Sequence, residues 1–222
     1  MHMKSGILKK LALCLTTGIF VIGAAGCGGT QDQTQETAQG TSSQGTASIS
    51  SAAETTDAGM HHVEITIKDY GTIALELDAD TAPVTVENFI NLAEEGFYDG
   101  LTFHRIIDGF MIQGGDPAQS GDSKTAATIP GEFASNGYEN NISHKAGVIS
   151  MARTPDPNSA SSQFFITVAD SEFLDGEYAA FGYVTEGLDV AQKIAEEAKP
   201  IDENGTIPFE EQPVIEKVVV ID

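Results

Sequence analysis

Residues 103–116 read FHRIIDGFMIQGGD, a stretch that sets one arginine among bulky apolar residues and closes with a double glycine before an acid. Two runs of β-forming residues, 101–107 and 110–113, flank an Asp108-Gly109 pair. Asp-Gly between such runs is a strong signal for a tight turn, so the stretch predicts a β-hairpin.

Successive side chains of a strand point to opposite faces, which predicts the arrangement within this hairpin. In the first run, Phe103 and Arg105 should share one face. An arginine in a strand is usually a solvated surface charge, and that interpretation would hold for Arg105 if the hairpin stood alone. In the second run, alternation separates two pairs: Phe110 with Ile112 on one face, and Met111 with Gln113 on the other.

Two more blocks lie downstream of the hairpin. The second reads GVISMAR at 147–153 and continues with QFFITV at 163–168. The third reads FLDG at 173–176, followed by Tyr178 and by FG at 181–182. The blocks FHRII-GFM-QGGD, G-ISMAR, SQFFI and FLDG…FG resemble, in order and approximate spacing, the cyclophilin family of peptidyl-prolyl isomerases.

The rest of the pattern is typical of a β protein. From residue 63 apolar and polar residues alternate, and further short β-type runs follow, the last at 213–221. Two amphipathic helical stretches interrupt them, one opening at Pro83 and one at 188–198. Many short strands with two helices predict a closed or nearly closed antiparallel barrel. The resemblance, which covers roughly residues 63–222, implies a mainly β fold, a closed eight-stranded antiparallel barrel capped by two α-helices.

One arginine suffices for the chemistry that this resemblance implies. An X-Pro amide rotates over a barrier of about 18–20 kcal/mol, because rotation breaks the C–N conjugation. In the twisted state the nitrogen regains a lone pair, so a fixed donor beside it stabilises that state without a covalent step, a metal or a cofactor. Arg105 supplies a permanently charged, forked set of donors. In an apolar cleft it would bind the twisted amide more strongly than the planar one, so we expect Arg105 to be catalytic.

The resemblance implies roles for the residues around Arg105. Gln113, which we assign to the catalytic group, and Gln163 are expected to orient the arginine or the substrate backbone. The other residues are expected to line the groove: Phe110, Met111, Phe165 and Leu174 around the proline ring, and Ala152 with Arg153 beside them. Each could instead be plain core, an interpretation that alternation favours for Phe164 and Ile166.

Three positions depart from the usual cyclophilin pattern. Arg153 stands where many eukaryotic members have Asn, which is expected to alter recognition of the substrate backbone more than catalysis. Phe173 stands where drug-sensitive members have Trp, and the missing indole N–H argues against tight cyclosporin binding. Tyr178 replaces the usual His at the groove wall. Because Tyr can still stack and donate, we expect activity to survive with a shifted substrate preference.

Four polar residues are predicted to be structural rather than functional. His104 precedes Arg105 in a strand and should face away from it, which favours a structural histidine over an acid–base role. Asp116 follows the double glycine and is interpreted as a turn-stabilising acid. His61 and His62 lack further ligands nearby, so no metal site is predicted there.

Charge and cysteine content exclude several classes of function. Lys and Arg number 11 against 33 Asp and Glu, which gives a net charge of −22. Phosphate would be repelled, so nucleic acid is not an expected partner. High acidity is typical of an exported protein that must stay soluble. The two cysteines, Cys14 and Cys27, both lie near the start, so the rest of the chain has no disulfide and no cysteine metal site.

Residues 1–26 resemble the signal peptide of a bacterial lipoprotein. A lysine-bearing start precedes an apolar run at 11–22, and small residues lead directly into Cys27. The resemblance implies that Cys27 becomes the lipidated first residue, the alternative being an ordinary signal peptide with an incidental cysteine. Residues 27–60 contain almost no large apolar side chain and predict a flexible tether, which leaves 61–222 as the isomerase domain.

Together these features predict a prolyl isomerase that is lipid-anchored to a bacterial membrane, outside the cytoplasm, and assists the folding of exported proteins. Its partners would be proline-containing polypeptides and, through Cys27, the membrane. The competing hypothesis is a cyclophilin-like module that binds proline-containing segments as a chaperone or adaptor without catalysis. Without heptads or internal repeats, the chain is expected to be a monomer.

Overall fold

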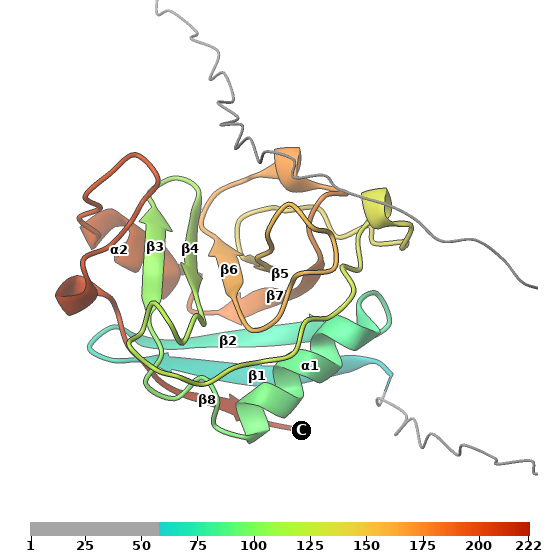
Figure 1. Ribbon diagram of the computed structural model, residues 1–222, viewed down its shortest axis with the longest axis horizontal. Helices are drawn as coiled ribbons and strands as arrows, with labels where there is room; N and C mark the ends of the chain where they lie inside the picture. The colour runs from blue at the N-terminus through green and yellow to red at the C-terminus, as the bar shows by residue number, and fades with distance from the viewer. Residues whose placement is uncertain (1–57) are drawn as a thin grey trace, which may run out of the picture. The chain divides into compact units, whose positions relative to one another are not determined.

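Figure 1 shows the computed structural model, which describes residues 58–222. Its strands are β1 (Met60–Ile67), β2 (Gly71–Asp78), β3 (Phe103–Ile107), β4 (Met111–Gly114), β5 (Val148–Met151), β6 (Phe164–Thr167), β7 (Ala180–Glu186) and β8 (Ile215–Val220). The helices are α1 (Pro83–Glu94), α2 (Leu188–Glu197) and the 3-10 helices η1 (Ala134–Asn136), η2 (Glu172–Leu174) and η3 (Phe209–Glu211). The predicted signal peptide, Cys27 and nearly all of the predicted tether lie outside the described residues. Within 58–222, no helix is long and apolar enough to span a membrane.

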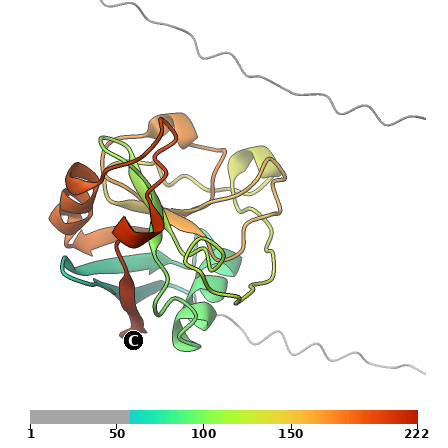
Figure 2. The same ribbon diagram turned by 60° about the vertical axis from the view of Figure 1, so that its left-hand side comes forward.

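The eight antiparallel strands and two α-helices agree with the prediction, but the sheet is an open half-barrel, so the predicted closure is wrong. The strand order is β3-β4-β6-β5-β7-β2-β1-β8, which leaves β3 and β8 as the edges. Just ahead of these two strands, Thr102 and Val214 form an isolated bridge. The strands themselves do not pair, because the loop after α2 runs along the outer edge of β3 (Figure 2). Thr206 of this loop forms an isolated bridge with Arg105. Pro213, which has no N–H to donate, precedes β8.

The β3–β4 hairpin forms as predicted, but its two faces differ from the prediction. The register shifts between Phe103 and Arg105, a bulge that inserts His104. The bulge reverses the alternation, so Phe103 packs in the main core whereas Arg105 lines a pocket on the opposite face. The predicted pairing of Phe110 with Ile112 is also wrong. Phe110 belongs to the turn and lines the pocket, while Ile112 lies in the core.

The main core fills the curve of the sheet, and two helices cover it. α1 lies against β8 and β2, and α2 lies against β2 and β4. Phe89 of α1 reaches into the aromatic centre of this core, where its ring lies 5.0 Å from Tyr98 and 5.5 Å from Phe164. Phe164 and Ile166 are both fully buried here, as alternation favours, and β6 therefore presents Phe165 to the other side of the sheet.

Candidate active site

The curved sheet brings ten of the eleven predicted catalytic and substrate-binding residues around one pocket of about 430 Å³: Arg105, Phe110, Met111, Gln113, Ala152, Arg153, Phe165, Phe173, Leu174 and Tyr178. Gln163, the eleventh, lines an adjoining pocket of about 190 Å³ that shares Gln113, Ala152 and Arg153 with the first. The β3–β4 hairpin, the end of β5, β6 and the segment from η2 to Tyr178 each supply part of the lining.

An apolar cluster forms the floor of the pocket. Met111, Phe165 and Leu174 are only 1%, 5% and 8% exposed. Phe110 and Tyr178 pack against them, and the ring of Tyr178 meets that of Phe165 edge-on at 5.9 Å. Such a floor excludes water and accepts a small apolar ring.

Phe173 stands at the mouth of the pocket. Its side chain is 73% exposed, and its ring lies 5.4 Å from that of Phe110. The 3-10 helix η2 accounts for this position, because it turns Leu174 into the floor and leaves Phe173 outside. A phenylalanine presents no polar atom to a ligand, so this part of the rim offers no side-chain hydrogen bond.

Arg105 is held by contacts that leave part of its guanidinium available. Its Nε donates to the backbone oxygen of Asn204 at 2.7 Å, and its Nη1 donates to Gln113 Oε1 at 3.2 Å. The sulfur of Met111 also lies 3.7 Å from Nη1. Among the described residues, Nη2 has no hydrogen-bond partner. Burial lowers the pKa of Arg105, but the pKa of an arginine begins so far above neutrality that the group stays charged at physiological pH.

A relay of side-chain amides orients Gln113. Its Nε2 donates to Gln163 Oε1 at 3.0 Å, and Gln163 Nε2 donates to Asp116 Oδ2 at 2.8 Å. Arg105 can only donate and an ionised carboxylate can only accept, so the two ends of the chain fix the direction of both amides. Asp116 also accepts from the N–H of Ala118 at 3.0 Å, which agrees with the predicted role in a turn.

Arg153 lines the pocket, but its hydrogen bonds go to neighbouring backbone oxygens. Nε and Nη2 donate to the backbone oxygen of Glu177 at 2.9 and 2.8 Å, and Nη1 donates to that of Thr154 at 3.0 Å. The guanidinium lies between two rings, 4.9 Å from the centre of Phe133 and 4.8 Å from that of Tyr178. This geometry favours a role in holding Tyr178 as a groove wall.

A buried histidine supports the floor from below. His144 Nδ1 lies 2.9 Å from Asp175 Oδ1, its Nε2 lies 3.0 Å from Ser150 Oγ, and its ring stacks on Phe165. Burial lowers the pKa of His144, although the hydrogen bond to Asp175 opposes this effect. Ser150, His144 and Asp175 are linked by hydrogen bonds in the order of a catalytic triad. Ser150 is completely buried, however, so its hydroxyl cannot reach a substrate.

His104 is the residue inserted by the bulge of β3. It is 8% exposed, and burial lowers its pKa. Its Nδ1 has no hydrogen-bond partner within the described part of the chain. The pocket lining does not include His104, in agreement with a structural role.

Besides the support from His144, two features of the network around Arg105 were not predicted from the sequence. Asp116 was assigned only to a turn, yet it ends the relay through Gln163. The Asn204-Gly205 pair signals a turn, but no local pattern connects that turn with Arg105, 99 positions earlier.

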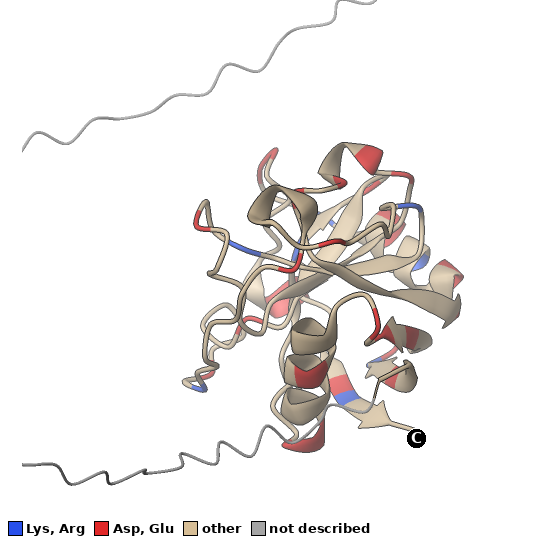
Figure 3. Ribbon diagram, turned by 90° about the vertical axis from the view of Figure 1, so that its right-hand side faces the viewer, with Lys and Arg blue, Asp and Glu red and all other residues tan. Residues whose placement is uncertain are grey.

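Both arginines of the chain, Arg105 and Arg153, lie at this pocket, although Asp and Glu outnumber Lys and Arg by 33 to 11 and acidic positions are spread over much of the ribbon (Figure 3). Across 58–222, no three His, Cys, Asp or Glu side chains are grouped so as to hold a metal ion. The arrangement can hold a small apolar ring against the floor and direct a charged N–H donor at an amide beside it.

Comparisons with known proteins place the chain in a family. Residues 62–220 match the model of the cyclophilin type peptidyl-prolyl cis-trans isomerase. Peptidyl-prolyl cis-trans isomerase A of Dickeya dadantii is 49% identical over 57% of this chain and 67% of its own length. A peptidyl-prolyl cis-trans isomerase of Acinetobacter baylyi is 47% identical over 56% of this chain and 67% of its own. The crystal structure of a cyclophilin-type isomerase of Cryptosporidium parvum, in the presence of the dipeptide Ala-Pro, aligns with a TM-score of 0.62 at 29% identity, covering 72% of this chain and 99% of that one.

Proposed function

The chain belongs to the cyclophilin-type peptidyl-prolyl cis-trans isomerase family, and from that premise we propose how its pocket accelerates the isomerisation of prolyl peptide bonds. The observation that carries the proposal is the position of Arg105. Two of its nitrogens are held by Asn204 and Gln113, while Nη2 has no partner among the described residues and remains free for a substrate.

The proline ring of the substrate would rest on Met111, Phe165 and Leu174, which hold it still while the preceding carbonyl rotates. As the amide twists, its nitrogen becomes basic and accepts a hydrogen bond from Nη2 of Arg105. The planar amide nitrogen has no free lone pair and cannot accept this bond. The interaction therefore strengthens on the way to the transition state, which is the requirement for catalysis.

The relay keeps the donor in place during this motion. Gln113 holds Nη1, and Gln163 with Asp116 prevents the Gln113 amide from turning over. The guanidinium of Arg105 does not have to reorganise when the amide twists, because its hydrogen-bond partners already hold it in place. Neither a covalent intermediate nor a cofactor enters this scheme.

We extend the proposal to the setting of the reaction. The Ala-Pro dipeptide in the Cryptosporidium parvum crystals supports proline-containing peptides as ligands of this pocket too. The sequence pattern of residues 1–26 and Cys27 supports lipid anchoring outside the cytoplasm of a bacterium. The substrates would then be exported polypeptides that fold beside the membrane.

The decisive experiment compares wild-type protein beginning at residue 28 with Arg105→Ala in a prolyl-peptide isomerisation assay. A hydrogen bond involving a charged group contributes about 1.5–3 kcal/mol, so kcat/KM should fall roughly 10- to 150-fold. Peptide binding should change little, because the ring still meets the apolar floor. Lys124→Ala, which removes a cation that is not part of the pocket lining, serves as the control. Full activity in a folded Arg105→Ala protein would refute the assigned role, and an inactive wild type would favour the non-catalytic binding module.

A further inference from the structure

The loop between α2 and η3 is joined to the outer edge of β3. Ile106 donates its N–H to the oxygen of Gly205 at 2.8 Å, and Ile207 donates to the oxygen of His104 at 3.0 Å. These bonds flank Arg105 on both sides and bring the oxygen of Asn204 to its Nε at 2.7 Å. The loop thus acts as a short extra strand that reaches the arginine side chain.

Two backbone hydrogen bonds close this loop, from Ile201 N–H to the Thr206 oxygen at 2.9 Å and from Gly205 N–H to the Asp202 oxygen at 3.2 Å, and the side chain of Asp202 adds two more. Its Oδ1 accepts from the N–H of Asn204 at 3.0 Å and from the N–H of Thr206 at 3.1 Å, so one carboxylate ties both sides of the turn. These bonds, chiefly the one from Thr206, lower the pKa of Asp202. The carboxylate therefore stays ionised, and its charge also favours the charged form of Arg105.

The turn at Gly205 lies very close to β3. Gly205 has a φ of +84°, a conformation that side-chain-bearing residues rarely adopt. A Cβ at this position would lie 2.5 Å from the oxygen of Ile106 and 2.5 Å from Cγ1 of Ile107. The glycine therefore lets the turn approach β3 closely enough for the Asn204 oxygen to reach Arg105.

We propose that Asp202 is a positioning residue for catalysis: it shapes the 201–207 loop so that the Asn204 oxygen holds the Nε of Arg105 and aims Nη2 into the pocket. The inference rests on the role proposed above for Arg105. Without the Nε bond, the guanidinium would keep only its contacts through Nη1 and could swing about them. Misplacing a catalytic group by about 1 Å can cost as much as 100-fold in rate, so a partial release should be measurable.

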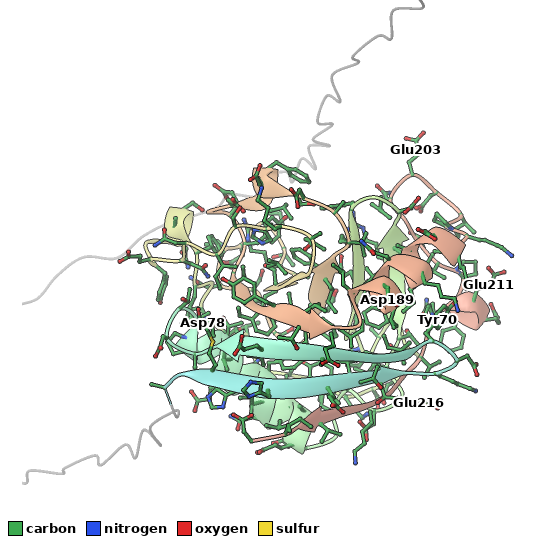
Figure 4. The ribbon with its side chains drawn as sticks, turned by 180° about the vertical axis from the view of Figure 1, so that it is seen from behind. Tyr70, Asp78, Asp189, Glu203, Glu211 and Glu216 are labelled. Atoms are coloured by element: carbon green, nitrogen blue, oxygen red, sulfur yellow. The ribbon has the colours of Figure 1, made fainter. Side chains whose placement is uncertain are left out.

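The test uses three variants of the chain from residue 28. Asp202→Ala removes both loop bonds, whereas Asp202→Asn keeps an oxygen that can accept them without the charge. Glu203→Ala removes the neighbouring carboxylate, which points away from the domain at the tip of the loop (Figure 4). We expect kcat to fall roughly three- to tenfold in Asp202→Ala, with peptide Kd within twofold of wild type. Asp202→Asn and Glu203→Ala should stay within twofold of wild type in both.

A spectroscopic readout separates positioning from general damage. With two arginines in the chain, arginine-selective ¹⁵N labelling gives two Nε–H signals. The Nε of Arg153 donates to the Glu177 oxygen and serves as an internal control. In Asp202→Ala, hydrogen exchange of the Arg105 Nε–H should speed up while that of Arg153 stays unchanged.

The outcomes distinguish this inference from the role of Arg105 itself. Faster exchange together with a lower kcat supports the proposal. Unchanged exchange at Arg105 overturns it, and so does faster exchange with an unchanged kcat. An equal loss in Asp202→Asn and Asp202→Ala also overturns it, because charge rather than loop geometry would then be acting. The Arg105→Ala measurement separately decides whether the arginine matters at all.

Discussion

Arg153→Ala should destabilise the protein and disturb its groove together, because this arginine ties the wall of the pocket to the rest of the chain. Three of its N–H groups meet backbone oxygens of Glu177 and Thr154, and its guanidinium lies between Phe133 and Tyr178. The side chain of Arg153 is only 14% exposed, so water competes little for these contacts in the folded protein.

The expected magnitude follows from those contacts. Each hydrogen bond contributes about 0.5–1.5 kcal/mol net, and each cation–π contact about 0.5–1 kcal/mol. The ion pair with Glu177 adds little, because that carboxylate is mostly exposed. Since such terms are not fully additive, we expect the free energy of unfolding to fall by about 2–4 kcal/mol. For a domain of this size the Tm should fall by roughly 5–15 °C.

Thermal unfolding and peptide isomerisation assays on the same variants test this reasoning. Arg153→Ala should also lower kcat/KM about three- to tenfold, mainly through KM, because Tyr178 loses its support. Arg153→Lys should fall between wild type and Arg153→Ala, since an ammonium cannot reproduce the fork. The matched control is Lys124→Ala: Lys124 likewise bonds the backbone oxygens of Phe97 and Asp99, but away from the pocket. Its loss should lower Tm alone. A normal Tm with a raised KM in Arg153→Ala would refute the role of Arg153 in holding Tyr178 and would indicate direct contact between Arg153 and the substrate.

Three further predictions concern pH, drug binding and the relay. Burial lowers the pKa values of His104 and His144 in the folded protein. Below a pH of about 6.5 the unfolded chain therefore binds more protons than the folded protein, which favours unfolding. Urea unfolding should accordingly show a lower free energy of unfolding at pH 5.5 than at pH 7.5. Equal stability at the two pH values would contradict this. Phe173→Trp should raise cyclosporin affinity roughly two- to tenfold in a titration, because an indole N–H adds one hydrogen bond of about 0.5–1.5 kcal/mol; an unchanged Kd would count against the assigned position. Asp116→Ala should lower kcat/KM about two- to fivefold by freeing the Gln163 amide, whereas Asp116→Asn should retain activity, and equal rates in the two variants would argue against the relay.

Local patterns in the sequence predicted the elements well, because alternation and helical periodicity depend on neighbouring residues. The alternation that begins at Val63 corresponds to the strands β1 and β2. The helix opening at Pro83 corresponds to α1, and the 188–198 stretch to α2. The resemblance of three separate blocks likewise anticipated which residues meet around the pocket.

Alternation predicted the wrong face where one inserted residue shifted the register of a strand. Alternation placed Phe103 and Arg105 together, but the bulge at His104 sends the first to the core and the second to the pocket. A bulge leaves no periodic trace in the sequence, since it adds one residue to a strand whose composition stays the same. Phe110 was misplaced for a related reason, because the strand β4 begins one residue after it.

The sequence alone therefore determined the family, the order of the elements and the residues of the pocket, since these depend on short motifs and their spacing. Only the tertiary structure decided how those residues are held. The oxygen of Asn204 meets Arg105 across 99 residues, and Gln113 meets Gln163 across 50. It also decided that β3 pairs with a loop rather than with β8, which leaves the barrel half open. Contacts between distant segments arise from the packing of the whole sheet, and no local pattern of side chains encodes them.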